Sequence, residues 1–102
     1  MATKFTDDVI NIIAGIPRGR VMSYGAIAAL AGSPRAARHV VRILHSSTAK
    51  HDLPWHRVVN SKGEIAFKNA KAFAEQKSLL EAEGVEISAK GEIAEGFIIT
   101  PE

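Results

Sequence analysis

Residues 23–45 have the sequence SYGAIAALAGSPRAARHVVRILH, and the predicted fold is built around them. Ser23 is a candidate N-cap for a short helix over 24–31, because a serine hydroxyl at that position accepts a hydrogen bond from a free helix N–H. Gly32 is expected to end this helix, since glycine readily adopts the left-handed conformation found at many helix ends. Another helix follows after a tight Gly-Ser turn, and the pair predicts a helix-turn-helix over about 23–45.

The helix after this turn has the clearest amphipathic pattern in the chain. Ser33 is its expected cap and Pro34 its first residue, where the missing N–H of proline costs nothing. At 3.6-residue spacing one face is basic and the other is apolar. The basic face contains Arg35, Arg38, Arg42 and His45, and the apolar face contains Ala37, Val40, Val41 and Leu44. The apolar face is predicted to pack in the core and the basic face to remain exposed.

The remaining segments predict a mainly α fold with small β elements. Thr6 is a candidate cap for an N-terminal helix that stops before Pro17, with Asp7 and Asp8 in its first turn, where carboxylates favour the positive helix end. The other predicted elements are a loop over 46–52, extended segments over 53–60 and 63–67, a helix over about 70–83 and a terminal hairpin over 85–99.

Length and composition limit the classes of protein to which the chain can belong. We expect 102 residues to form a single domain over 1–102, and 46% apolar with 24% charged residues is typical of a soluble globular protein. No apolar run approaches the roughly 18 residues of a membrane span, so we expect no membrane partner and an intracellular location, cytoplasmic or nucleoid-associated, or nuclear in a eukaryote. The net charge of +2 permits nucleic-acid binding without establishing it.

Metal and cofactor chemistry find little support in the sequence. The chain contains no cysteine, which excludes a cysteine-rich zinc site. His51 and His56 could bind a metal together, but no third ligand is convincingly spaced. We therefore predict neither a metal site nor a cofactor.

The five residues Pro54-Trp55-His56-Arg57-Val58 are the most informative motif for function. They resemble the active-site signature Pro-Cys-His-Arg-Val of the O6-alkylguanine-DNA alkyltransferases. The resemblance extends over about 21–85 and includes the helix-turn-helix and the run Leu79-Leu80-Glu81-Ala82-Glu83-Gly84. It implies a single winged-helix-like helix-turn-helix domain, similar to the C-terminal domain of those enzymes.

Trp55 stands where the family has its alkyl-accepting cysteine. An indole is no nucleophile at neutral pH, whereas a thiol near a basic histidine readily becomes one. The same replacement marks the alkyltransferase-like proteins, which resemble the repair enzymes but only bind the lesion. The resemblance therefore implies a non-enzymatic protein with no catalytic residue.

The resemblance implies that two residues turn the damaged nucleotide out of the duplex. Arg38 matches the arginine that enters the base stack, a role that suits a planar guanidinium. Tyr24 matches the tyrosine that crowds the 3′ phosphate of the target nucleotide. The alternatives are a solvated or phosphate-bound arginine and an ordinary half-buried tyrosine.

Other residues are assigned to a lesion pocket, its support and the DNA backbone. The pocket residues are Trp55, Val58, which should offer backbone groups to the base edge, and Lys68, which could lie over the purine. A single tryptophan in a small domain is often part of the core, so that alternative stays open for Trp55. His56 and Glu83 are expected to form a supporting hydrogen bond, and Arg57 to brace the segment. The implied contacts with the DNA backbone come from Ser33, Arg35, Ala36 and Arg42, and Ser47 replaces the family's hinge asparagine.

The implied function is recognition of double-stranded DNA containing O6-alkylguanine through the minor groove. As a monomer, the protein would flip the damaged nucleotide into its pocket and flag it for nucleotide excision repair proteins. Two alternatives remain. An alkyltransferase would need a cysteine, which the sequence lacks, and a base hydrolase would need a carboxylate or activated amine beside the sugar, to which no residue is assigned. A sequence-specific helix-turn-helix regulator would prefer one undamaged site.

Overall fold

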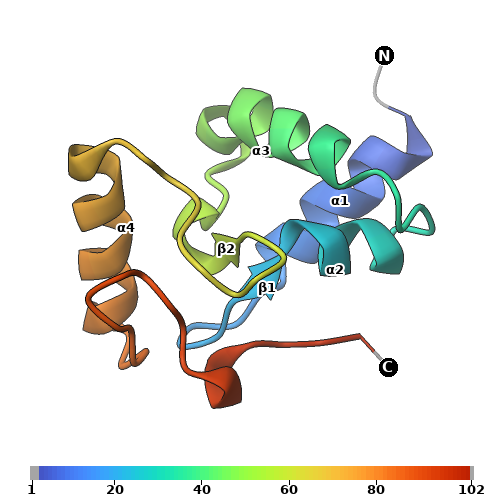
Figure 1. Ribbon diagram of the computed structural model, residues 1–102. Helices are drawn as coiled ribbons and strands as arrows, with labels where there is room; N and C mark the ends of the chain where they lie inside the picture. Colours follow the sequence, from blue (N-terminus) through green and yellow to red (C-terminus); the bar gives the residue numbers. More distant parts are fainter. Residues whose placement is uncertain (1–2, 102) are drawn as a thin grey trace.

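Four α-helices and a short strand pair form the fold across residues 3–101, the part of the chain that the computed structural model describes (Figure 1). In chain order the elements are α1 (Lys4–Ala14), β1 (Met22–Ser23), α2 (Tyr24–Leu30), α3 (Ala37–His51), the 3₁₀ turn η1 (Trp55–Arg57), β2 (Val58–Val59), α4 (Ala70–Ala82) and the 3₁₀ turn η2 (Glu95–Phe97). The predicted mainly α class with small β elements is confirmed. Residues 1, 2 and 102 of the predicted domain lie outside the described part.

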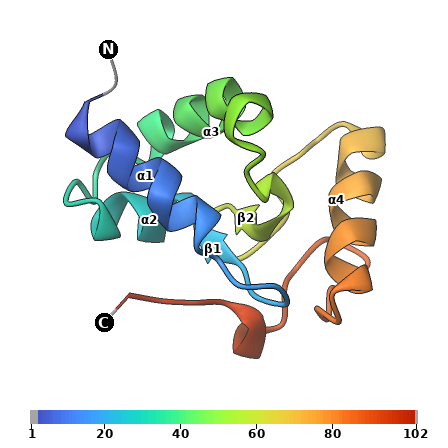
Figure 2. The ribbon, with the colours of Figure 1, turned by 180° about the vertical axis from the view of Figure 1, so that it is seen from behind.

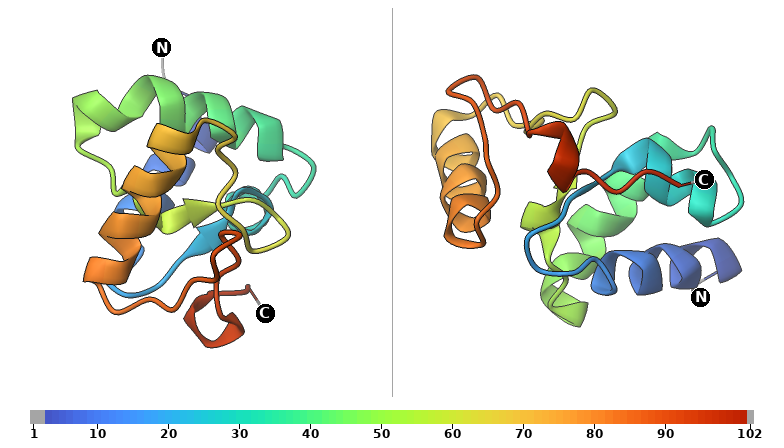
Figure 3. Two further views of the ribbon diagram at one scale, coloured as in Figure 1. Left: turned by 60° about the vertical axis from the view of Figure 1, so that its left-hand side comes forward. Right: turned by 90° about the horizontal axis from the view of Figure 1, so that it is seen from below.

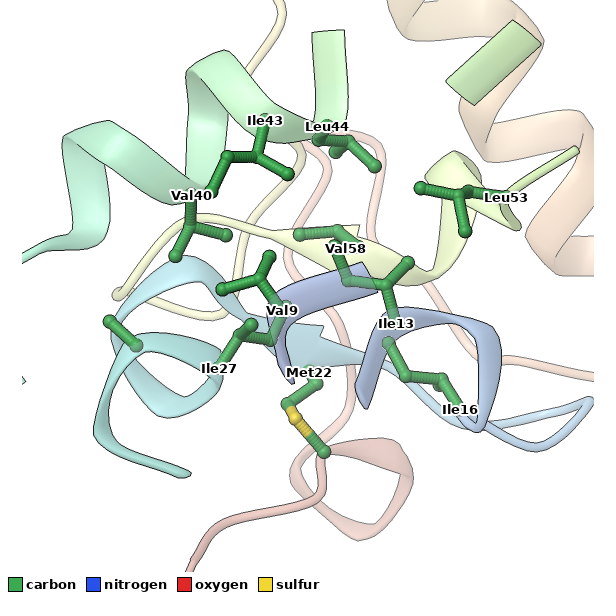
Figure 4. Close-up of a cluster of buried hydrophobic side chains, with 11 residues drawn as sticks. Val9, Ile13, Ile16, Met22, Ile27, Val40, Ile43, Leu44, Leu53 and Val58 are labelled. Atoms are coloured by element: carbon green, nitrogen blue, oxygen red, sulfur yellow. The ribbon is translucent and has the colours of Figure 1, made fainter. Parts of the chain in front are cut away.

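The first three helices pack around one hydrophobic core. α1 packs against α2 and α3, as the view from behind shows (Figure 2). Val9, Ile13, Ile27 and Val40 are fully buried where these helices meet. Figure 4 shows side chains from the three helices gathered around Val58 of β2. This core holds the helix-turn-helix in a fixed position relative to the Trp55 segment.

A parallel strand pair connects the helix-turn-helix to the Pro54–Val58 motif. Met22 is paired with Val58 and Ser23 with Val59. β1 leads directly into α2, and β2 directly follows η1, so the pairing brings the ends of these two parts of the chain into contact. The two segments that carry the family resemblance, more than 30 residues apart in the sequence, therefore lie side by side.

α4 and the C-terminal tail form a second core. Its buried residues are Val21, Val59, Ile65, Leu80, Val85 and Ile93. From the end of α4 the tail runs back past β1, where Val21 and Ile98 form a parallel bridge (Figure 3). The predicted terminal hairpin is present in a reduced form, with one antiparallel bridge between Ile87 and Ile93 and a left-handed Gly91 in its turn.

α1 begins three residues earlier than predicted. Its N-cap is Thr3, whose hydroxyl accepts a hydrogen bond from the Thr6 N–H at 3.1 Å. Thr6 is therefore a helical residue and not the cap. The helix ends at Ala14, before Pro17 as expected.

α3 begins later than predicted, and Ser33 does not cap it. The Ser33 N–H donates to the Ala28 carbonyl at 2.9 Å, and Gly32 is left-handed with φ 90°, so both residues close α2 in a Schellman motif. Pro34 then lies in a turn in which the Ala36 N–H donates to the Ser33 carbonyl at 2.9 Å. The helix starts at Ala37, which makes the connection longer than the predicted tight turn.

The polar segment predicted as a loop over 46–52 continues α3 as far as His51. Hydroxyl groups in this segment are satisfied by carbonyls of the preceding turn: Ser46 donates to Ile43 at 3.3 Å, and Thr48 donates to Leu44. Asp52 closes the helix in the left-handed conformation, with φ 49°. The hydroxyl groups of Ser46 and Thr48 are thus satisfied within the helix, so the polarity of this segment does not end it.

The predicted extended segments are mostly irregular. Residues 55–57 form η1, and the strand that follows contains only Val58 and Val59. In the second segment Glu64 makes a single bridge with Glu92. Between residues 3 and 101 no helix is long and apolar enough to cross a membrane.

Candidate functional site

A pocket of about 380 Å³ opens between the first turn of α2, the exposed side of α3 and η1. Its size is at the lower end of the range for small-ligand sites. The lining residues are Tyr24, Val41, Leu44, His45, Thr48, Trp55, Val58 and Phe67. Most of this surface is carbon, so the pocket suits a flat or apolar group with few polar contacts.

Trp55 is both a wall of this pocket and a partner of the core. It is the first residue of η1, and its half-buried indole packs against the first hydrophobic core. The indole meets the Phe67 ring edge-on, with centroids 6.0 Å apart and an interplanar angle of 81°. The two alternatives considered for Trp55, core residue and pocket wall, therefore apply to different faces of one side chain.

Tyr24 lies at the pocket because α2 begins there. The Ser23 hydroxyl accepts a hydrogen bond from the Ala26 N–H at 3.0 Å, which confirms the predicted cap of α2. Burial raises the pKa of the Tyr24 phenol above its ordinary value of 10.0. The phenol is therefore neutral at physiological pH and can both donate and accept a hydrogen bond.

A charged network lies behind η1. His56 Nε2 is hydrogen-bonded to Glu83 Oε2 at 2.7 Å, the expected pair. Arg57 donates to the same carboxylate through Nη2 at 2.9 Å and Nε at 3.1 Å, and the Gly19 N–H donates to Glu83 Oε1 at 2.7 Å. Burial alone would raise the pKa of Glu83, but the hydrogen bonds from Arg57, Gly19 and His56 outweigh it and lower the pKa to about 2.

This network joins three segments that are far apart in the sequence, and its side chains do not reach into the pocket. Arg57 also donates through Nη1 to the Ile16 carbonyl at 2.9 Å, which ties η1 to the end of α1. His56, Arg57 and Glu83 are absent from the pocket lining. The geometry accordingly favours a supporting role for these residues over direct contact with a ligand.

Gln76 is a site residue that the sequence analysis missed. Its side chain is 1% exposed, and Nε2 donates to the carbonyls of His56 and Val58, both at 2.9 Å. The amide thus holds both ends of the segment that follows Trp55. Gln76 lies on the same face of α4 as Phe73 and Leu80, and a polar residue within that apolar row was the signal that could have identified it.

The polar side of α3 combines a basic surface with one wall of the pocket. Arg38, Arg42 and His45 are exposed, as predicted. Val41, predicted for the core, is 42% exposed and lines the pocket. His45, predicted for the exposed basic face, lines the pocket too.

The connection between α2 and α3 contains the other residues assigned to the DNA backbone. Ser33 and Arg35 are exposed, and Ala36 is partly buried. Arg35 precedes α3 and is therefore not part of its helical face.

Two of the predicted pocket residues are arranged differently from expectation. Lys68 is exposed and is not among the lining residues, whereas its neighbour Phe67 is. The Val58 N–H donates to the Trp55 carbonyl, and the Val58 carbonyl accepts from Gln76. Since both backbone groups are engaged, Val58 contributes to the pocket chiefly through its side chain. Within residues 3–101 no three His, Asp or Glu residues are grouped so that they could hold a metal ion.

Exposed arginines along the second helix of a helix-turn-helix are typical of small DNA-binding domains. Comparison with known proteins agrees, because the family model of the 6-O-methylguanine DNA methyltransferase, DNA binding domain, matches residues 4–85. The chain belongs to this family. The sequence contains no cysteine, so this member cannot accept an alkyl group on a cysteine thiol, the residue for which its methylated-DNA–protein-cysteine methyltransferase relatives are named.

The relatives include a protein named for base flipping and one named for its likeness to an alkyltransferase. A DNA base-flipping protein from Vibrio parahaemolyticus is 44% identical over 91 residues, covering 89% of this chain and 90% of its own length. Alkyltransferase-like protein 1 of Schizosaccharomyces pombe is 40% identical over 85 residues, covering 82% of this chain and 79% of its own. The crystal structure of S. pombe Atl1 in complex with damaged DNA containing O6-carboxymethylguanine matches with a TM-score of 0.79 at 31% identity, covering 99% of this chain and 100% of that one.

Proposed function

We propose that this protein binds DNA containing O6-alkylguanine, turns the damaged nucleotide out of the duplex and holds its base in the pocket beside Trp55 without removing the alkyl group. The observation that carries the proposal is an apolar pocket directly beside a basic helix-turn-helix, with an unreactive indole at the position of the family's nucleophile. The names of the relatives, a base-flipping protein and a protein crystallised with damaged DNA, support it.

Arg38 and Tyr24 have the chemistry to rotate a nucleotide. The exposed guanidinium of Arg38 would fill the gap in the base stack, and Tyr24, at the mouth of the pocket, would crowd the phosphate beside the target. Ser33, Arg35, Ala36 and Arg42 would contact the DNA backbone on either side. Since the minor groove carries a degenerate code, such binding is nearly independent of sequence.

The energies involved are compatible with selective capture of a damaged base. Unstacking a base costs a few kcal/mol, least for a damaged one, and contact with an aromatic side chain returns about 1–3 kcal/mol. Burial of an alkyl group adds about 0.8 kcal/mol per methylene. An alkylated guanine therefore gains enough in the pocket to shift a nearly balanced equilibrium that normal guanine does not shift.

If the protein binds the lesion without repairing it, the complex of protein and damaged DNA persists. We propose that this complex, formed by a monomer, marks the lesion for nucleotide excision repair proteins. The cavity has an indole where the family has its alkyl-accepting thiol, which supports a marking role.

Competition binding on matched duplexes tests the proposal. At a fixed, stated salt concentration, duplexes with O6-methylguanine should compete better than the same duplexes with guanine, whatever the flanking sequence. Preference for one undamaged sequence would instead indicate a transcription regulator. Stoichiometric methyl transfer or base release would indicate an enzyme.

Two variants test the assigned roles. Arg38→Ala should weaken binding to damaged and normal DNA alike, because charge and stack filling are both lost. Trp55→Ala should weaken binding to damaged DNA more than to normal DNA. Equal losses for Trp55→Ala, together with a lowered melting temperature, would show that Trp55 acts only through the core.

A further inference from the structure

The last two turns of α3 extend the exposed side of this helix beyond the part that the sequence predicted to be helical. The helix continues to His51, and the Asp52 N–H then donates to the Thr48 carbonyl. Ser46 and Lys50 in this extension are exposed. No described element lies above α3 in the views of Figures 1 and 2, so its outer side is uncovered.

Four exposed side chains form one row along α3. Residues four apart lie on the same side of an α-helix, and those at this spacing are Arg38, Arg42, Ser46 and Lys50, which we call the α3 row. Thr48 lines the pocket, and Lys50, two residues later, is turned about 200° away from it. At about 1.5 Å per residue, Lys50 lies about 12 Å beyond Arg42 along the helix axis.

The α3 row carries positive charge that no carboxylate compensates locally. Within residues 3–101 no ion pair includes Arg38, Arg42 or Lys50. The sequence has no Asp or Glu between Asp8 and Asp52, and Asp52 itself is not paired with Lys50. A row of unpaired cations is complementary to a line of phosphate groups, such as the backbone of DNA.

We infer that Lys50 contacts the phosphate backbone of the bound duplex, so that the DNA interface of this protein extends over the last two turns of α3. The inference rests on DNA binding through α3 and adds a contact that the proposed function does not require. With Arg38 at the target base pair, Lys50 lies about 18 Å farther along the helix, at a phosphate several nucleotides from the lesion. Ser46 leaves room between the cations, because its short side chain bonds back to the Ile43 carbonyl at 3.3 Å.

The salt dependence of binding tests this contact on matched duplexes with O6-methylguanine and guanine. Lys50→Ala should lower the slope of log K against log salt by about one for both duplexes, so that the ratio of wild-type to variant affinity shrinks about threefold between about 50 and 200 mM salt. Lys50→Arg keeps the charge and should keep the slope. A lysine in the last turn also favours the negative helix end, but that structural effect would not change the slope. Lys90→Ala removes an exposed lysine of the tail and is the matched control.

Shortening the duplex distinguishes a local contact from general attraction to DNA. Duplexes trimmed stepwise from either end should lose the phosphate that faces Lys50 before they lose the phosphate that faces Arg42. Beyond that length, trimmed from one end, wild-type protein and Lys50→Ala should bind equally, whereas Arg42→Ala should still bind more weakly. A Lys50 effect that persists at every length that still binds would overturn the inference, because no particular phosphate would then be involved.

A second variant tests the row with Lys50 in place. Ser46→Glu puts a carboxylate between the two cations and should weaken binding to both duplexes. Ser78→Glu makes the same change at an exposed position of α4 and should leave binding unchanged. Fluorescence of Trp55, the single tryptophan, reports whether each variant retains the native fold around the pocket.

The outcomes separate this inference from the proposed function. If the Lys50→Ala and Ser46→Glu variants bind as wild type does while O6-methylguanine is still preferred, the Lys50 contact is wrong and the proposed function stands. If wild-type protein binds the two duplexes equally but Lys50→Ala lowers the slope, the proposed function is wrong and the Lys50 contact stands.

Discussion

At the scale of single residues, Glu83 joins three segments of the chain. Its carboxylate accepts hydrogen bonds from the Gly19 N–H, His56 and Arg57, and its side chain is only 5% exposed. This network has a structural function, because it holds η1 against the ends of α1 and α4.

Replacing Glu83 with glutamine is expected to destabilise the protein by about 2–3 kcal/mol, since Arg57 loses the charge that compensates its burial. Urea denaturation measures the change. Glu81→Gln is the matched control on the same helix: Glu81 pairs with Lys77 at 3.0 Å but is 48% exposed, so its loss should cost less than about 0.5 kcal/mol. Equal effects of the two substitutions would contradict the role assigned to Glu83.

The ionisation of Glu83 should make the stability of the protein depend on pH. The pKa of Glu83 is lowered to about 2 from an ordinary value of 4.5. Because the folded state holds the ionised carboxylate more favourably than the unfolded state does, Glu83 stabilises the folded state at pH values above 4.5. This stabilisation is lost as the pH falls from 4.5 towards 2. The free energy of unfolding should decline more steeply over this range in wild-type protein than in Glu83→Gln. Parallel pH profiles would show that Glu83 contributes nothing to the acid sensitivity.

At the scale of elements, α4 determines the shape of the Trp55 segment without lining the pocket. Gln76 donates to two carbonyls of that segment from within the apolar face of the helix. Each bond joins residues at least 18 positions apart, so the segment depends on the packing of α4 for its conformation.

Gln76→Leu is expected to cost about 2–4 kcal/mol, because the carbonyls of His56 and Val58 lose their donor while remaining away from water. Urea denaturation gives the loss, and Trp55 fluorescence shows whether the neighbouring turn has moved. Glu75→Leu changes the adjacent, exposed position of α4 and should alter stability by no more than about 0.5 kcal/mol. A Gln76→Leu variant as stable as wild type would mean that these carbonyls find other partners.

Gly91 connects the tail to α4 and provides a second prediction at this scale. It has φ 88°, and a Cβ at this position would lie 2.6 Å from the Phe73 ring. Gly32 has φ 90° but no atom within 4 Å of such a Cβ, so a substitution there introduces the backbone strain without the steric overlap and serves as the control. We expect Gly32→Ala to cost about 1 kcal/mol and Gly91→Ala about 2–4 kcal/mol in thermal denaturation. Equal costs would indicate that the Phe73 ring moves aside freely.

At the scale of the whole molecule, the basic surface and the pocket share α3. Arg38 and Arg42 are exposed on this helix, while Val41, Leu44, His45 and Thr48 of the same helix line the pocket. Docking of the basic surface on DNA would therefore bring the pocket to the duplex at the same time.

Electrostatic contact with phosphate should make DNA binding depend on salt. We expect Arg42→Ala to lower the slope of log K against log salt by about one, and to weaken binding to damaged and normal duplexes equally. Lys77→Ala removes a cation that is already paired with Glu81 on α4 and should leave the slope unchanged. An unchanged slope for Arg42→Ala would remove this residue from the DNA interface.

Local periodicity and helix caps in the sequence predicted the helical class and the helix-turn-helix. That Trp55 takes the place of a reactive cysteine is implied by the resemblance to a family. The sequence also predicted the pair His56–Glu83, but only through resemblance to a family.

Only the tertiary structure decided which side chains surround the pocket and what holds its wall in place. Phe67 and Thr48 had no distinguishing local pattern, and Gln76 was marked only by its polarity within an apolar row. The start of α3 depended on the hydrogen bonds that close α2. The physical reason is that burial and hydrogen bonding between residues far apart in the chain arise only when the helices pack. Local sequence preferences determine the elements, but the packing of those elements determines the site.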